Sequence, residues 1–279
     1  MRKLRGWQQV LAQVGLTVAG LFTLLPLLAM LRLAFDGSIK GAPAEFALLP
    51  KEFTLTVFQS VWQTPSQTLS FLGLLKNSTL VSGGAAAASI ILGTSMAYAF
   101  ARFRFPGKRV GLFALLAGSL LPPVALMTPL YILLSQLGLR TSLWGLVVVY
   151  TAFSMPFCIW NMRAAFQAAP RELEEAAFLD GASPLVAFWR VSLPLALPAI
   201  GVAAVVAFLA GYTEFAIGWL FVEDSQNVTL AMAVFGMLGL SGMSWSKLAA
   251  ISLLMSLPVT GLVLVLHRWL FEVSVFKNA

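Results

Sequence analysis

Six apolar stretches, each about as long as a membrane span, set the main limit on how this chain can fold. They cover about residues 12–33, 77–101, 110–134, 142–162, 196–221 and 248–271. The hydrocarbon core of a bilayer is about 30 Å thick, and a helix needs about 20 apolar residues to cross it. Because lipid offers the backbone no hydrogen-bond partners, such stretches cross as helices. The sequence therefore predicts an all-α polytopic membrane bundle of six transmembrane helices, built as a single domain of residues 1–279.

The start of the chain resembles a signal peptide, with Arg2, Lys3 and Arg5 before an apolar stretch. That stretch runs from about 10 to 35, which is longer than the apolar part of a typical signal peptide and long enough to span. We therefore interpret it as a retained signal anchor.

Basic residues divide unevenly between the two sides of this layout. Twelve fall on one side: Arg2, Lys3, Arg5, Arg102, Arg104, Lys108, Arg109, Arg163, Arg171, Arg190, Arg268 and Lys277. Six fall on the other: Arg32, Lys40, Lys51, Lys76, Arg140 and Lys247. Because Lys and Arg concentrate on the cytoplasmic side of membrane proteins, both termini and the loop 163–195 are predicted to be cytoplasmic. The net charge of +7 then reflects topology and does not indicate nucleic-acid binding.

The sequence lacks the residues that several kinds of functional site would need. Cys158 is the one cysteine and His267 the one histidine, so no disulfide framework and no multi-histidine metal centre is expected. The sequence has no GxxxxGK[ST] phosphate-binding loop, so the chain is not expected to hydrolyse ATP by itself. We predict a protein that is not an enzyme and that carries neither a cofactor nor a metal.

Two further features concern the spans and the outer segments. Pro122-Pro123 lies near the middle of the third stretch and should break or kink its helix, either as a packing kink or as part of a transport pathway. Residues 36–72 and 222–246 form two outer segments, the first too polar for lipid.

Residues 170–198, which we call the elbow, form a long polar-to-amphipathic insert between the fourth and fifth predicted spans. Pro170 suits a first helical position, and Gly181 can adopt the positive φ that ends a helix. Ser183-Pro184 then restarts a helix, which Pro194 is expected to end. The result is a helix–Gly–helix turn whose small residues allow close docking of a partner. The predicted docking residues are Glu175, Ala176, Ala177, Asp180, Gly181, Ala182, Ser183 and Pro184.

The elbow resembles the EAA loop of ABC importer permeases. Glu175-Ala176-Ala177, three residues, Gly181, nine residues and Val191-x-Leu193-Pro194 match that signature, with Val191 in place of the usual Ile. The resemblance implies a multi-pass protein of a prokaryotic inner membrane. It also implies two ATPase subunits docked at the elbow, a related second permease and an extracytoplasmic solute-binding protein.

Other segments are similar to carbohydrate permeases of the maltose-permease-like second-subunit type. They are 97–107 (AYAFARFRFPG), 128–131 (TPLY) and 208–215 (FLAGYTEF). Thr213 stands where that subfamily commonly has Asn, and the tail 271–279 lacks its Gly-rich basic ending. The similarity implies sugar import.

Glu214 is the one acidic residue inside a predicted span, and buried charges in lipid are costly and usually functional. It falls near the outer interface, where water or Lys76 could satisfy it. A structural role and a role in the substrate path both remain open. Because no second intramembrane acid accompanies Glu214, a proton relay is not expected.

Three alternatives compete with a sugar permease. An ABC permease for an amino acid, peptide or polyamine would carry the same elbow. An ion-coupled secondary carrier would use Glu214 and need no ATPase. A membrane enzyme would need paired catalytic groups inside the membrane, and this sequence offers none.

Overall fold

The computed structural model describes residues 6–39, 41, 43, 47, 49–66, 68–238 and 244–275, with side chains in the last helix described as far as Leu266. Arg2, Lys3, Arg5 and Lys40 of the charge count lie outside these residues, and so do 276–279 of the 271–279 tail, Lys277 among them. His267 and Arg268 lie where the side chains are not described. Within the described part the chain is helical and holds no β-strand.

Four long helices and one continuous helical run could each cross a bilayer. They are α1 (Gly6–Phe35), α3 (Phe71–Arg102), α6 (Leu143–Ala168), the run Pro184–Thr213, and α12 (Trp245–Val275). The run comprises α8 (Pro184–Ala187), the π-helix η2 (Phe188–Ser192) and α9 (Leu193–Thr213). Shorter helices connect them: α2 (Thr56–Gln63), α7 (Arg171–Leu179), α10 (Ala216–Phe221), η3 (Ser225–Asn227) and α11 (Leu230–Leu238).

A sixth span is broken at the double proline. It consists of α4 (Lys108–Leu120), the 3₁₀ helix η1 (Pro123–Leu126) and α5 (Met127–Gln136), and the two halves are bent by 102°. Leu121 and Pro122 are extended between them, because a residue before proline is driven out of the α region. The predicted break in the third span is confirmed.

Several helix ends differ from the sequence prediction. α6 continues past residue 162 to Ala168, so the first part of the predicted loop 163–195 is helical. Pro194 does not end the second elbow helix, which continues from Pro184 to Thr213. Pro194 falls in the first turn after the wider π turn of η2, where a missing N–H and a bulky ring are tolerated. The predicted fifth span, 196–221, is interrupted after Thr213.

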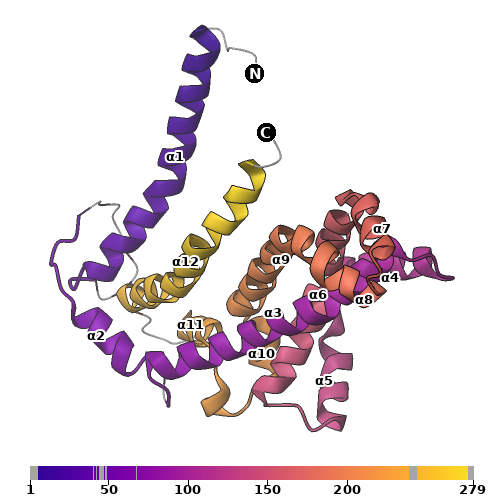
Figure 1. Cartoon of the computed structure of the whole chain (residues 1–279). Coiled ribbons are helices and arrows are strands. Elements are labelled where there is room, and N and C mark those ends of the chain that lie inside the picture. Colours follow the sequence, from indigo (N-terminus) through magenta and orange to yellow (C-terminus); the bar gives the residue numbers. More distant parts are fainter. Residues whose placement is uncertain are drawn as a thin grey trace.

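Small residues let α3, α6 and α9 pack closely as the centre of the bundle (Figure 1). A Cβ added at Gly84 would lie 3.1 Å from Val147, and one at Gly211 would lie 3.3 Å from the Ser82 backbone. Glycine and serine in α3 therefore allow neighbouring helices to pack at close range.

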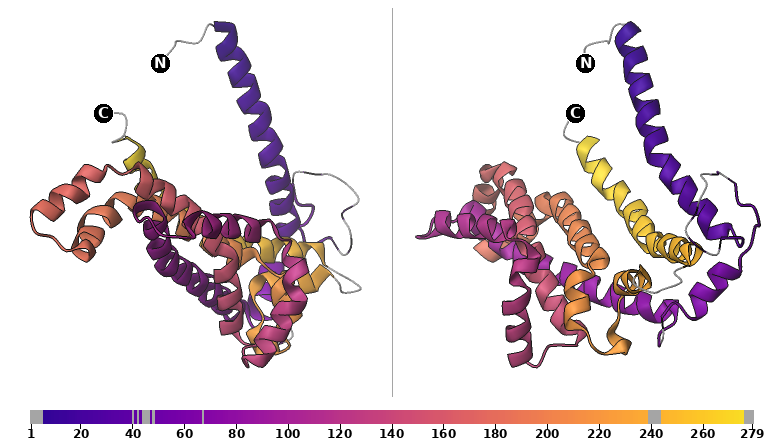
Figure 2. Two further views of the ribbon diagram at one scale, coloured as in Figure 1. Left: turned by 90° about the vertical axis from the view of Figure 1, so that its right-hand side faces the viewer. Right: turned by 180° about the vertical axis from the view of Figure 1, so that it is seen from behind.

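The helices α1 and α12 form a separate pair beside this centre (Figure 2). Most of α1 is exposed, with only Arg32 and Ala34 buried. α1 descends toward the bundle and α12 returns alongside it, so Gly6 and the end of α12 lie at the same end of the pair (Figure 1).

Hydrogen bonds to Asp36 hold the segment after α1 in place. Its carboxylate accepts hydrogen bonds from Ser38 Oγ at 2.6 Å and from the backbone N–H groups of Lys51 and Glu52 at 3.0 and 3.4 Å. Its carbonyl accepts from Ser246 Oγ of α12 at 3.1 Å. Burial raises the pKa of Asp36, but the hydrogen bonds outweigh burial and lower the pKa to about 2.

We expect this lowered pKa to make the segment after α1, which the Asp36 carboxylate holds in place, sensitive to acid. A depressed pKa stabilises the fold above the unfolded value of 3.8, and this contribution disappears as pH falls through about 2. Asp36→Asn should lower Tm by a few degrees at neutral pH, and the gap to wild type should close between pH 4 and 2. Thermal unfolding in detergent measures it, with the exposed Asp180→Asn as control. A gap that is constant with pH would contradict this role for Asp36.

Candidate functional site

The elbow is built by local hydrogen bonds that its sequence anticipates. Gly181 has φ +84°, and its N–H donates to the Phe178 carbonyl at 3.0 Å. The hydroxyl of Ser183 accepts from the Val186 N–H at 3.4 Å and caps α8. Pro170 lies one position before the helix and not at its first position, since α7 begins at Arg171. These contacts give the helix–Gly–helix turn that the sequence predicts.

The tip of the elbow is exposed and largely apolar. In Figure 2, left, α7 and α8 project away from the bundle. Leu179 is 89% exposed, Leu185 67% and Trp189 59%. Ala177 and Ala182 are partly exposed, whereas the other predicted docking residues are exposed: Glu175, Ala176, Asp180, Gly181, Ser183 and Pro184. The elbow therefore presents a protruding apolar surface with carboxylates at its edge.

Glu174, which the sequence analysis did not single out, behaves differently from its neighbours on α7. It is buried, and its carboxylate lies 2.8 Å from Nε of Arg102 at the end of α3. Ser192 Oγ donates to the same carboxylate at 2.7 Å. No local signal in the sequence separates Glu174 from Glu172 and Glu175, because its partner Arg102 lies 72 residues away.

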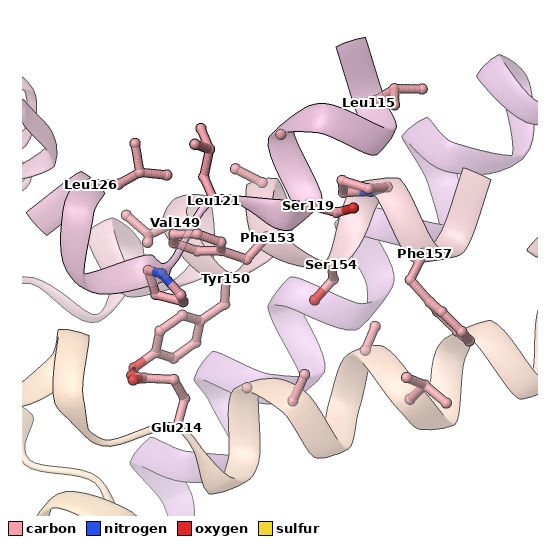
Figure 3. A pocket seen from close by; sticks show the side chains of 18 of the residues that line it. Leu115, Ser119, Leu121, Leu126, Val149, Tyr150, Phe153, Ser154, Phe157 and Glu214 are labelled. Carbon is pink, nitrogen blue, oxygen red and sulfur yellow. Dashed lines mark hydrogen bonds between the residues drawn. The ribbon is translucent and has the colours of Figure 1, made fainter. Parts of the chain in front are cut away.

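A cavity of about 780 Å³ lies against the broken span (Figure 3). Residues from α3, α4, α5, α6, α9 and α10 line it, and most of them are apolar. Phe153 and Phe157 of α6 contribute aromatic rings to its wall. Polar groups reach it at four places: Ser119, Tyr150, Ser154 and Glu214. The cavity is thus apolar with a few polar groups, which is the usual composition of a small-molecule site.

Glu214 lies at the helix break between α9 and α10, not inside a continuous span as predicted. The Tyr150 hydroxyl donates to its carboxylate at 2.6 Å, and Figure 3 shows the two side chains meeting at the cavity. The N–H groups of Ile217 and Gly218 donate to it at 3.0 and 3.4 Å. Tyr150, rather than the suggested Lys76, is therefore its partner, and Glu214 caps α10 while facing the cavity.

The two sites share helices. The elbow follows α6 and leads into α9, whereas the cavity is lined by the middle of α6 and by the far half of α9. Within the described residues, no three His, Cys, Asp or Glu side chains gather as metal ligands would.

Residues 89–272 match the family described as "Binding-protein-dependent transport system inner membrane component". The chain is 35% identical over 201 residues to the maltose/maltodextrin transport system permease protein MalG of Escherichia coli K12, covering 70% of this chain and 68% of that one. It is 26% identical to the trehalose/maltose transport system permease protein MalG of Thermococcus litoralis, over 94% of each chain.

A solved structure shares the fold. It is a chain of a bacterial ABC transporter involved in the import of the acidic polysaccharide alginate, with a TM-score of 0.78 and 20% identity. The match covers 96% of this chain and 99% of that chain.

Proposed function

The chain belongs to the family of binding-protein-dependent transport system inner membrane components, and we propose on that basis that it is the carbohydrate permease subunit of an ABC importer. It is a multi-pass membrane protein. The sugar class rests on its similarity to two permeases named for maltose and for trehalose or maltose. Its N- and C-termini and its elbow face the cytoplasm, in line with the excess of basic residues on that side.

The elbow is the surface on which an ATPase subunit docks. This assignment is supported by its exposed apolar tip, Leu179, Leu185 and Trp189, on a projection of the bundle. A patch of this kind outside the membrane is characteristic of a protein interface. Glu175 and Asp180 at its edge suit a basic partner surface. Each of two ATPase subunits would hold one elbow, one from this chain and one from a related second permease.

The cavity beside Glu214 is part of the sugar path. Its volume of about 780 Å³ is in the range of small-ligand sites. The rings of Tyr150, Phe153 and Phe157 can pack on the apolar faces of a sugar, while Ser154 and Glu214 offer hydrogen bonds to its hydroxyl groups. A solute-binding protein delivers the sugar from outside, and ATP-driven movement of the elbow rocks the spans as rigid bodies.

Gly181→Pro should remove ATPase docking, because proline cannot adopt a φ of +84° and has no N–H to donate to Phe178. We expect the co-purified ATPase to fall roughly tenfold or more, since about 1.4 kcal/mol of lost interaction already gives tenfold. The measurement is affinity purification of the tagged chain from mildly solubilised host membranes, followed by identification of its partners.

Gly138→Pro is the matched control. Gly138 also has a positive φ, of 66°, and its N–H donates to Ser135, but it lies before α6 and thus at the opposite end from the elbow. The control should keep the ATPase. If wild type purifies without an ATPase, and Gly181→Pro behaves identically, the ABC assignment fails and an ion-coupled carrier using Glu214 takes its place.

A further inference from the structure

Glu174 is the centre of a buried polar cluster where three parts of the chain meet. Arg102 Nε of α3 donates to Glu174 Oε1 at 2.8 Å, and Ser192 Oγ of η2 donates to the same oxygen at 2.7 Å. The Tyr98 hydroxyl donates to Oε2 at 3.3 Å. Arg102 also donates from Nη2 to the carbonyl of Ala169, just before α7. We call these five residues the Glu174 junction.

Burial makes the Glu174 junction a rigid connection. The side chains of Arg102 and Glu174 are 7% and 10% exposed, and Ser192 is fully buried. A charged pair shielded from water is held far more strongly than an exposed one, and separating the partners leaves a buried charge without compensation. Tyr98 adds aromatic packing on Phe166 and Phe188. By contrast, Glu172 and Glu175 on the same short helix are exposed.

The junction joins the elbow to the two helices that lead to the cavity. Arg102 is the last residue of α3, and Ser192 directly precedes α9. α9 then runs 21 residues, roughly 30 Å at 1.5 Å per residue, to the break at Glu214. On the way Gly211 packs against Ser82 of α3 and against Tyr150, the partner of Glu214. A displacement of the junction is therefore transmitted along packed helices to the cavity wall.

We propose that Glu174 is a positioning residue that makes the elbow move as one body with α3 and α9, so that ATPase movement reaches the sugar path. The proposal rests on the proposed function and adds the residue that carries the coupling. Without the ion pair, α7 keeps its chain connections, its packing on η2 and the hydroxyl hydrogen bonds at Glu174, but it loses the charged contact with the end of α3 that holds its orientation. The elbow can then move with the ATPase while the transmembrane helices keep their positions.

The test compares import with ATP hydrolysis in the purified complex. Wild type, Glu174→Gln and Arg102→Gln are each reconstituted in proteoliposomes together with the second permease, the ATPase subunits and the binding protein, with maltose as the probe. We expect each variant to hydrolyse ATP yet to lower the maltose imported per ATP by roughly tenfold, within the range of measured coupling between sites. The maltose concentration at half-maximal import should not change. The double variant should be no worse than either single one, because both remove the same contact.

Glu172→Gln is the matched control, two residues away and exposed, and should leave the import ratio at the wild-type value. Ser192→Ala removes one hydroxyl hydrogen bond and keeps the ion pair, so it serves if Glu174→Gln does not assemble; it should lower the ratio by a smaller factor. An unchanged ratio in assembled Glu174→Gln or Ser192→Ala complexes overturns the proposal. The absence of an ATPase from purified wild type would instead overturn the proposed function.

Discussion

Alanine at position 145 is expected to destabilise the folded chain by about 3 kcal/mol or more, at the upper end of overpacking effects. A Cβ at Gly145 would lie 2.3 Å from the carbonyl oxygen of Leu139. That oxygen cannot easily move, since it accepts from the N–H and hydroxyl of Ser142, the N-cap of α6, at 3.3 and 2.7 Å. We expect Tm of the isolated, detergent-solubilised chain to fall by roughly 10 °C.

Gly83→Ala is the control for this substitution. Gly83 lies within α3 with no atom within 4 Å of an added Cβ. Alanine is favoured over glycine in a helix by about 1 kcal/mol, so Gly83→Ala should be neutral or stabilising. Equal Tm values for the two variants would show that the α5–α6 turn is not tightly packed.

Glu214→Ala is expected to abolish most import and to destabilise the chain. It removes the acceptor for the Tyr150 hydroxyl, which belongs to a buried residue, and for two N–H groups of α10. An unpaired buried group costs about 1–3 kcal/mol, and a lost helix cap about 1 kcal/mol more. Maltose import by the reconstituted complex and thermal unfolding of the same preparation measure the two effects together.

Glu214→Gln separates the capping role from a role for the charge. The amide keeps an oxygen that accepts from α10, and the Tyr150 hydroxyl can accept from the amide NH₂ in turn. We therefore expect Glu214→Gln to keep a Tm near wild type and substantial import. Normal Tm with lost import would show that the charge itself is required. If Glu214→Ala changed neither quantity, both roles would be wrong.

The spans and the elbow could be predicted because each depends on a local requirement. Bilayer thickness demands apolar length, whether or not neighbouring helices are known. The turn at Gly181 needs a positive φ, which glycine adopts without strain. The double proline at 122–123 breaks its helix through its own chemistry. In all of these places a few adjacent residues are sufficient to determine the structure.

The remaining features depend on residues far apart in the sequence. Glu174 is buried because of Arg102, 72 residues away. The helix break at Glu214 has neither proline nor glycine at that position. The Tyr150 hydroxyl, 64 residues away, helps to stabilise the break by donating to the Glu214 carboxylate. α6 continues to Ala168, beyond the apolar stretch that predicted a span ending at about 162, because a helix need not end where its apolar residues do. No local pattern distinguishes these cases.

The pairing of α1 with α12 determines the order in which the chain can be assembled during its synthesis. The first helix is made at once, but the helix on which it packs begins only at Trp245. At about 5–20 residues per second, the ribosome needs on the order of ten seconds or more to reach it. Throughout this time α1 must remain in the bilayer surrounded by lipid, without its partner helix. The surface of α1 is almost uninterruptedly apolar, and most of it stays exposed in the finished fold. The helix can therefore remain in lipid until α12 is made.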